Sequence, residues 1–308
     1  MHKIKRAFTM IELIFVIVIM GILSKFGVEF LAQAYNSFIF SSINNSLQSR
    51  SASALEIIGS RLQFRIKDSV IARQPGVTFE GLGDSTLGAN ATVLEWVGYD
   101  IDGLRGDSSP TWSGIIDLDN STFNLLNTPD TNLTEVTNII NALSNGNSNV
   151  GDIALYFIGS DSDIQNGYGW DGVKVSDQND TMHPVRMGAN NFFIPQDHPT
   201  ATDNNFTGVD VYEYYQLAWT AYAVALEDFD GDGTANELVL YYDYQPWDGE
   251  DYLNDGRATL LMENVDTFRF KSIGSIVKLQ VCVFSTIISG DVKDAAGGYS
   301  LCKEKTIF

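Results

Sequence analysis

The chain has 308 residues, 44% of them apolar, and a formal net charge of −20. This length is enough for one large domain or two modest domains behind a stalk. The charge is uneven: residues 1–73 carry nine Lys/Arg and four Asp/Glu, a net +5, and the remainder carries ten and 35, a net −25. An acidic exterior argues against binding to nucleic acid, which needs clustered Lys and Arg. It suits an extracytoplasmic or cation-binding domain, or serves solubility alone.

The first feature along the chain is an apolar segment, residues 8–23, which follows the basic head MHKIKR and is interrupted by Thr9 and Glu12. A secretory signal peptide has its small-residue cleavage site after the apolar run. No such site follows Leu23, and the small residue Ala7 lies before the run instead. The segment is therefore either a signal anchor with an isolated Glu or a leader that is cut ahead of its apolar part.

The order of residues in K-R-A-F-T-M-I-E resembles the class III leader of type IV prepilins and of the pseudopilins of type II secretion systems. The resemblance implies that a prepilin peptidase cleaves between Ala7 and Phe8 and methylates the new amino terminus of Phe8. It also implies that Glu12 is the family's acidic assembly residue, the fifth of the mature chain. One departure is Ala7, where the family usually has Gly; a small residue is still compatible with a tight peptidase site.

Glu12 has a physical reason to act in assembly. A charged carboxylate inside a membrane segment costs about 2.5–3.5 kcal/mol on insertion scales, so it normally has a partner. Cleavage before Phe8 would create one, the positive α-amine of that residue on a neighbouring subunit. We therefore expect Glu12 to guide the assembly of subunits.

A single long helix is predicted next, because the chain has no proline before Pro75. It would run from about Thr9 to about Ala72, a length of roughly 95 Å. We divide the chain into a leader (1–7), a membrane-spanning helix (8–31), an amphipathic remainder of that helix (32–73) and an acidic β-rich domain (74–308). Basic residues in the head keep it cytoplasmic. A coiled coil is the alternative for the amphipathic part, but heptads are not sustained.

Strands and turns dominate after Pro75. Short strands are predicted at residues 92–99, 114–118, 123–126 and 152–159. A helix is predicted at residues 131–143, capped by Asp130 or Thr131. Residues 161–205, rich in Asn, Asp, Gly and Pro, read as long surface loops. The last third predicts one antiparallel meander, with strands at residues 214–226, 237–244, 258–265, 266–273 and 275–285.

The segment LLMENVDTFRFKSIGSIVKLQVCVF resembles the carboxyl-terminal sheet of minor pilins and minor pseudopilins. The 301 residues that would remain after the leader also favour a minor subunit over a repeating major one. We therefore expect an α+β fold of the pilin-like lollipop type, in which a long amino-terminal helix packs on a carboxyl-terminal antiparallel β-sheet domain with loop insertions.

The loop DFDGDGTANE predicts a metal site. Asp228, Asp230 and Asp232 occupy alternate positions and are followed by a glycine, a spacing that lets a loop curl around a hard cation such as calcium. Val239 stands at the twelfth position of the EF-hand pattern, so Glu237 at the tenth is the available substitute. Thr234 would add its backbone carbonyl. The alternative is an acidic hairpin turn that needs no metal.

Cys282 and Cys302 are the two cysteines of the chain. In a periplasmic setting they predict a disulfide that closes a 21-residue loop, worth about 3 kcal/mol in the loop-entropy model. Two free buried cysteines are the alternative.

Catalytic motifs are not evident. The three histidines, His2, His183 and His198, show no H-x-x-H or H-E-x-x-H spacing, and no G-x-S-x-G or Walker loop occurs. Trp170 and Trp247 lie among turn residues. Aromatic residues on loops can bind sugars or partner proteins, and the alternative is that they form packed lids. We expect no enzymatic activity.

These patterns together predict a minor pilin or pseudopilin subunit that assembles through its helix into a type IV pilus or a type II secretion pseudopilus. We expect it in the bacterial inner membrane, crossed once, with its carboxyl-terminal domain in the periplasm, or outside the cell in a filament. Expected partners are other pilin or pseudopilin subunits, the prepilin peptidase and the inner membrane, and neither nucleic acid nor a small-molecule substrate. The alternative is a membrane-anchored glycan-binding or hydrolytic domain using residues 161–205, and a simple anchored structural protein is a third possibility.

Overall fold

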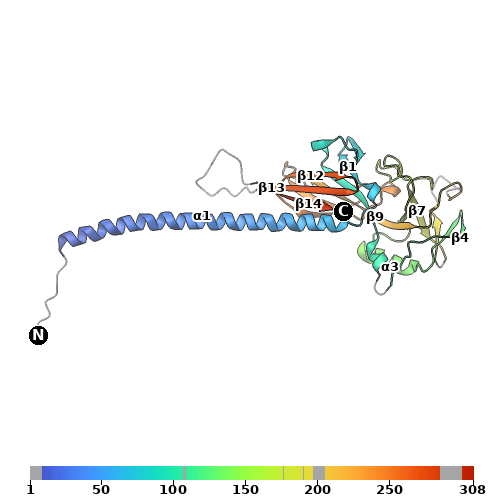
Figure 1. Cartoon of the computed structure of the whole chain (residues 1–308), viewed down its shortest axis with the longest axis horizontal. Helices are drawn as coiled ribbons and strands as arrows, with labels where there is room; N and C mark the ends of the chain where they lie inside the picture. Colours follow the sequence, from blue (N-terminus) through green and yellow to red (C-terminus); the bar gives the residue numbers. More distant parts are fainter. Residues whose placement is uncertain (1–8, 107–108, 176, 190, 197–204, 285–299) are drawn as a thin grey trace, which may run out of the picture.

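The long helix α1 (Met10–Leu62) dominates the shape of the molecule (Figure 1). The computed structural model describes residues 9–106, 109–175, 177–189, 191–196, 205–284 and 300–308. At 1.5 Å per residue the 53 residues of α1 span about 80 Å. A capping box at Thr9 and Glu12 starts the helix by satisfying backbone groups at its amino end. The expected α+β architecture, a long helix on an antiparallel β domain, is confirmed.

The predicted carboxyl end of this helix is wrong by about ten residues. Helix α1 ends at Leu62, and the chain continues through the short 3-10 helix η1 (Lys67–Ser69) into strand β1 (Ile71–Gln74). The backbone pairs with strand β3 (Val93–Tyr99) instead of with itself, because the Ile66 N–H donates to Val97 O at 2.9 Å and the Tyr99 N–H donates to Phe64 O at 2.9 Å. Pairing with the sheet therefore overrides the continuous helical pattern.

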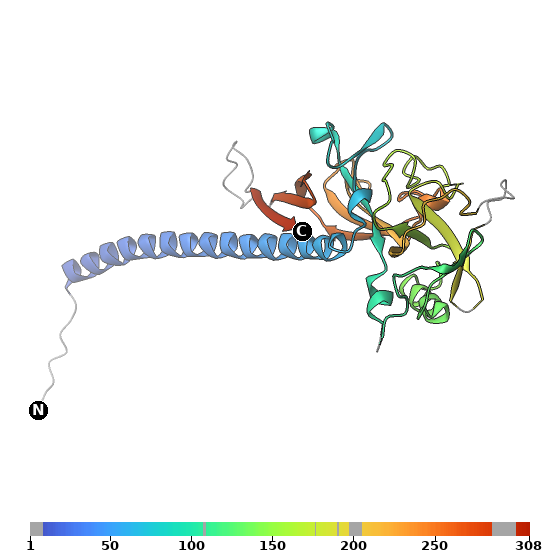
Figure 2. The same cartoon turned by 45° about the vertical axis from the view of Figure 1, so that its right-hand side comes forward.

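The described residues of the globular domain form two antiparallel sheets (Figure 2). The larger one runs in the order β2-β1-β3-β9-β6-β7-β8-β5-β4, and β10 and β11 extend from β9. The smaller one has the order β12-β13-β14. The bounds of the strands not yet given are β2 (Thr78–Gly81), β4 (Asp117–Thr122), β5 (Leu125–Asn127), β6 (Ala154–Phe157), β7 (Met182–Met187), β8 (Phe192–Pro195), β9 (Tyr215–Glu227), β10 (Glu237–Tyr242), β11 (Arg257–Met262), β12 (Val265–Ile273), β13 (Ile276–Phe284) and β14 (Ser300–Ile307).

Strand β9 is the spine of the larger sheet. One edge pairs with β3, and the other pairs first with β6 and then with β10. Short helical elements lie between the strands: η2 (Gly88–Asn90), α2 (Ile101–Arg105), α3 (Leu133–Leu143) and η3 (Pro246–Asp248). The predicted helix at 131–143 is confirmed in α3, although its cap is Asn132, whose side chain accepts the Glu135 N–H at 3.2 Å.

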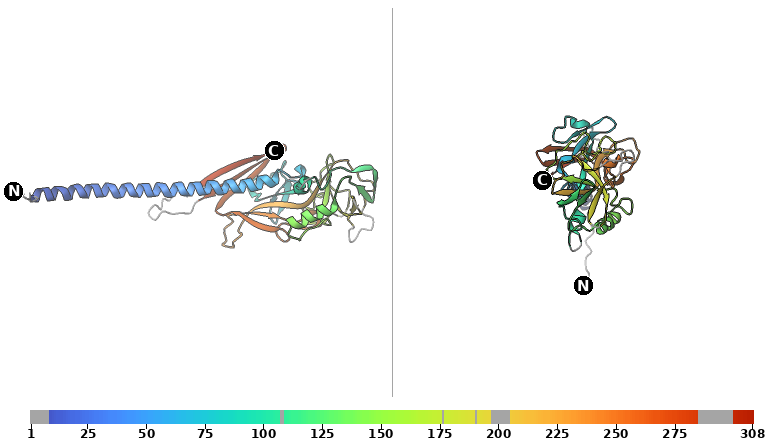
Figure 3. Two further views of the ribbon diagram at one scale, coloured as in Figure 1. Left: turned by 90° about the horizontal axis from the view of Figure 1, so that it is seen from below. Right: turned by 90° about the vertical axis from the view of Figure 1, so that its right-hand side faces the viewer.

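The last turns of α1 form one core with both sheets. Leu55, Ile58 and Leu62 are buried against apolar side chains of the larger sheet and of β12–β14. Gly59 permits the close approach, because a Cβ there would meet Lys305 Cε of β14 at 2.6 Å. The side view shows the rest of the helix projecting from this core toward the amino terminus (Figure 3).

Two further expectations are corrected by the strand topology. The predicted single meander divides in two: β9, β10 and β11 belong to the larger sheet, whereas β12, β13 and β14 form the smaller one. The chain changes sheets at Asn264, whose φ of 60° breaks the extended path. Residues 161–205 are not only surface loops, because β7 and β8 lie there and aromatic residues such as Tyr168 are fully buried.

The predicted disulfide is present. Cys282 and Cys302 are bonded, and they are direct cross-strand partners of β13 and β14. The bond therefore ties the carboxyl-terminal strand to the centre of the smaller sheet.

A buried ion pair crosses the core on the other face of the larger sheet. The guanidinium of Arg73 on β1 contacts the carboxylate of Glu95 on β3, and the Tyr244 hydroxyl donates to Glu95 Oε2 at 3.2 Å. Arg73 also donates to the Trp170 carbonyl at 2.8 Å. Burial raises the pKa of the Glu95 carboxyl, and the charge of Arg73 opposes that rise.

Replacement of Arg73 by methionine should lower the free energy of unfolding by about 3–5 kcal/mol, because it leaves the Glu95 carboxylate buried without its cation. Denaturant unfolding of the full chain in detergent measures the change. Arg50→Met on the exposed part of α1 is the control and should change it by less than about 0.5 kcal/mol. Equal stability of the two variants would contradict the role assigned to the pair.

Candidate functional site

No part of the chain that the structure describes covers the amino-terminal half of α1. Every residue from 9 to 38 is exposed, including large apolar side chains such as Phe15, Phe26 and Phe30, the last 70% exposed. Helix α1 is long and apolar enough to cross a membrane, and its most apolar window is unburied. Bare apolar surface of this size marks contact with lipid or protein. The segment fits a single-pass membrane anchor.

Glu12 lies in the first turn of this bare helix. Its Oε2 accepts the Thr9 N–H at 3.1 Å and the Thr9 hydroxyl at 3.0 Å. The Glu12 N–H in turn donates to Thr9 Oγ1 at 3.4 Å. The carboxylate is therefore held at the positive end of the helix dipole. The predicted cleavage residues Ala7 and Phe8 lie outside the described residues.

The acidic hairpin between β9 and β10 brings together three of the predicted metal ligands. Carboxylate oxygens of Asp228, Asp230 and Glu237 lie within 4.8 Å of one another. Asp228 and Asp230 are exposed, whereas Glu237 is 3% exposed and its Oε2 accepts the Phe229 N–H at 3.0 Å. Three carboxylates at this separation could hold a hard cation.

The other two predicted ligands are not part of this carboxylate group. Asp232 uses Oδ1 to accept the Thr234 N–H at 2.8 Å, so its side chain closes a local turn. Asp230 Oδ1 and Asp228 Oδ2 accept the N–H groups of Asp232 and Gly233 at 3.0 and 2.9 Å. Three of the four carboxylates singled out by the spacing thus converge, and the fourth organises the backbone of the loop.

The hairpin is also connected to the smaller sheet. The carbonyl oxygen of Asn236, at the end of the loop, accepts the Val265 N–H at the start of β12 at 2.9 Å. The conformation of this loop and the position of β12 are therefore linked through one backbone hydrogen bond.

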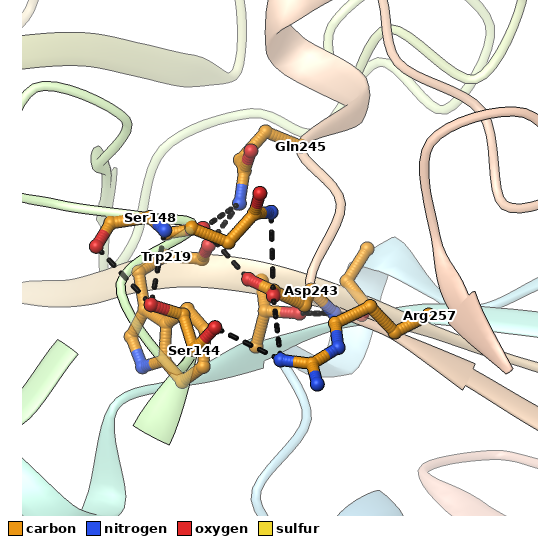
Figure 4. Close-up of polar contacts among 9 residues, drawn as sticks. Ser144, Ser148, Trp219, Asp243, Gln245 and Arg257 are labelled. Carbon is orange, nitrogen blue, oxygen red and sulfur yellow. Dashed lines mark hydrogen bonds and ion pairs between the residues drawn. The ribbon is translucent and has the colours of Figure 1, made fainter. Parts of the chain in front are cut away.

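The sequence patterns gave no indication of a polar network around Asp243 (Figure 4). Asp243 is 1% exposed, and its Oδ1 accepts the Ser148 hydroxyl at 2.7 Å. Arg257 Nη1 lies 3.8 Å from Asp243 Oδ2 and donates to the Ser144 carbonyl at 2.9 Å. Gln245 Nε2 donates to the Trp219 carbonyl at 2.7 Å. Asp243 has a positive φ of 65°, a backbone conformation that Asp adopts more readily than most residues.

This network joins the loop after α3 to strands β9 and β11 of the larger sheet and to the segment that follows β10. Burial raises the pKa of the Asp243 carboxyl, while the Ser148 hydroxyl and Arg257 oppose the rise. Among the described residues no histidine bonds to Ser148, so the arrangement contains serine and carboxylate without the base that activates a nucleophile. The contacts instead fix the end of α3 against the sheet.

The remaining chemical candidates are packing residues. His183 is buried between Phe157 and Phe206, its Nδ1 lies 3.2 Å from Gln178 Oε1, and burial lowers its pKa to about 4. The imidazole is therefore neutral at pH 7. Trp170 and Trp247 are 2% and 0% exposed, which confirms the packed-lid interpretation over exposed binding platforms. His2 and His198 lie outside the described ranges.

Comparison with known proteins bears on the amino-terminal segment. Residues 2–24 match the family model of the prokaryotic N-terminal methylation motif. No curated protein and no solved structure shows significant similarity to the chain. The matched residues contain the basic head, Ala7, Phe8 and Glu12, so the resemblance to a prepilin-type leader is confirmed. The chain thus carries a prepilin-type methylation motif on a bare apolar helix, consistent with a type IV pilin-like protein.

Proposed function

We propose that this chain is a minor pilin or pseudopilin subunit that assembles through α1 into a type IV pilus or a type II secretion pseudopilus. The observation that carries the proposal is the combination of the methylation motif at residues 2–24 with an exposed apolar surface on residues 10–40. A membrane anchor alone needs about 20 apolar residues. The additional exposed residues, among them Tyr35, Phe38 and Phe40, require a second apolar partner beyond the bilayer.

The proposed pathway has two stages. The helix first holds the subunit in the inner membrane, with the β domain in the periplasm, and a prepilin peptidase cuts between Ala7 and Phe8. The same apolar helix then packs among helices of neighbouring subunits. Glu12, already at the helix terminus, would pair there with the methylated α-amine of a neighbour's Phe8. Opposite charges in apolar surroundings attract strongly, so the pair fixes the axial register.

Substitution of Glu12 by alanine should leave cleavage before Phe8 intact. The amount of the subunit in the assembled fraction should fall about tenfold or more, because the contact that fixes the register is lost. Sheared filaments or cross-linked pseudopili, quantified by immunoblot, give assembly, and intact mass gives processing. Glu29→Ala is the matched control, since Glu29 is exposed and has its own partner, Lys25 Nζ at 3.9 Å. Wild-type assembly of the Glu12 variant would overturn the proposed pairing.

We further propose that the acidic hairpin binds calcium through Asp228, Asp230 and Glu237. Carboxylate oxygens are the ligands that calcium prefers, and this loop connects two central strands. A bound ion would neutralise the repulsion among three carboxylates and hold the hairpin that contacts Val265. The contribution would be structural, stabilising the β domain for assembly.

Calcium at a hundred times its dissociation constant should add about 2.7 kcal/mol to the free energy of unfolding, because it binds the folded state alone. The melting temperature should then rise by roughly 5–10 °C over a chelator-treated sample. The double variant Asp228→Asn/Asp230→Asn should lose this rise, and Asp119→Asn, an exposed aspartate elsewhere, should keep it. A rise that is absent from the natural chain, or equal in all three proteins, would contradict calcium binding here.

A further inference from the structure

A groove of about 540 Å³ runs along strand β12, and its lining includes no residue of α1 and none of the three carboxylates of the acidic hairpin. Residues 266–271 of β12 line the groove in succession. Residues 278–280 of β13 and Glu304 of β14 line it as well. Because side chains of a strand alternate between its faces, a wall built from six successive residues is the edge of the strand rather than one face. We call this hollow the β12 groove.

Beyond Val265, whose N–H donates to the Asn236 carbonyl at 2.9 Å, no strand in the described part of the chain pairs with the edge of β12 that faces away from β13. Strand β12 is nine residues long, and in the described part of the chain it pairs with β13 alone. The other wall of the β12 groove is made of small residues, Gly88, Ala89 and Ala91, with Thr92 and Leu226 beside them. Small side chains leave the backbone of β12 accessible, and such an edge presents unpaired N–H and C=O groups to another strand.

Three cationic side chains, Arg269, Lys271 and Lys278, line the β12 groove beside two anionic ones, Asp266 and Glu304, although the chain as a whole carries −20. Lys271 stands directly opposite Lys278 across the β12–β13 pair, and Arg269 lies two residues away on the same face. Like charges in directly opposed positions destabilise a sheet. Glu304 lies 3.6 Å from Lys278, but among the described residues neither Arg269 nor Lys271 has an ion-pair partner.

We propose that the β12 groove binds an extended acidic peptide segment of a partner protein, added as a strand to the free edge of β12. Backbone hydrogen bonds would supply affinity, as in other strand additions. Carboxylates at alternate positions of the segment would face Arg269 and Lys271, whose repulsion with Lys278 they relieve. This site goes beyond the proposed assembly role, because it uses no residue of α1 and no metal ligand.

Edge lysines also have a purely protective use, since charge on an edge strand discourages pairing. The two roles predict opposite results. A protective edge rejects every added strand and gains partners when its charges are removed. A binding edge accepts an acidic strand, rejects a basic one and loses the acidic one when its charges are reversed.

The test uses the full chain in detergent and a labelled ten-residue peptide that alternates Glu and Val, with binding followed by fluorescence anisotropy. We expect saturable binding that weakens with added salt, and no binding of the matching Lys and Val peptide. The double variant Arg269→Glu/Lys271→Glu should lose at least tenfold in affinity. Arg50→Glu/Lys67→Glu, the same charge change at two exposed positions, should bind as the natural chain does.

A second arm tests the backbone pairing. Two peptides methylated at alternate backbone nitrogens differ in which edge of the bound strand loses its N–H donors. One of them should bind at least tenfold more weakly than the other, because only one set of N–H groups can face β12. Failure of the acidic peptide to bind, unchanged binding to the Arg269/Lys271 variant, or equal binding of the two methylated peptides would overturn the proposal.

Discussion

The packing of the last turns of α1 into the core is the contact on which the rest of the molecule depends. Leu55, Ile58 and Leu62 are buried between the two sheets, while residues 9–38 of the same helix are bare. One continuous helix therefore contributes core residues to the globular domain at one end and an exposed apolar surface at the other. A force or displacement applied to the exposed half reaches the domain without passing through a flexible linker.

Several cross-links secure the smaller sheet around that helix. The disulfide joins β13 to β14, and the ion pair between Lys305 and Glu56 ties β14 to α1. On the other side, the Asn236 carbonyl holds the start of β12 to the acidic hairpin. A cation in this hairpin would therefore act on the junction between the two sheets. In the larger sheet the Arg73–Glu95 ion pair connects β1 to β3, and the Asp243 network connects the sheet to the loop after α3.

The sequence predicted the parts of the fold that local pattern determines. Strands 92–99 and 237–244 and the helix at 131–143 have strong periodicity and clear boundaries, and the structure has elements at each of these places. The end of α1 was misplaced because residues 63–72 have a helical composition, yet their backbone pairs with β3. The division of strands β9–β14 between two sheets depends on the turn at Asn264, and no periodicity in the sequence reveals it.

The candidate sites show the same limit. Spacing identified Asp228, Asp230 and Glu237, but it could not show that Asp232 bonds to its own loop. Residues 161–205 look like a surface insertion by composition, and part of this segment is buried because β7 pairs with β6, which lies about 25 residues earlier in the chain. The Asp243 network and the β12 groove each combine side chains from separated segments, so only the fold brings them together.

We expect residues 10–40 of α1 to exchange a lipid environment for the helices of other subunits. A photo-cross-linking amino acid at Phe26, which is 63% exposed, tests this directly when the membrane and the assembled fractions are analysed separately. We expect lipid adducts in the membrane fraction and adducts to the amino-terminal helix of a second subunit in the assembled fraction. Lipid adducts alone in both fractions would contradict it.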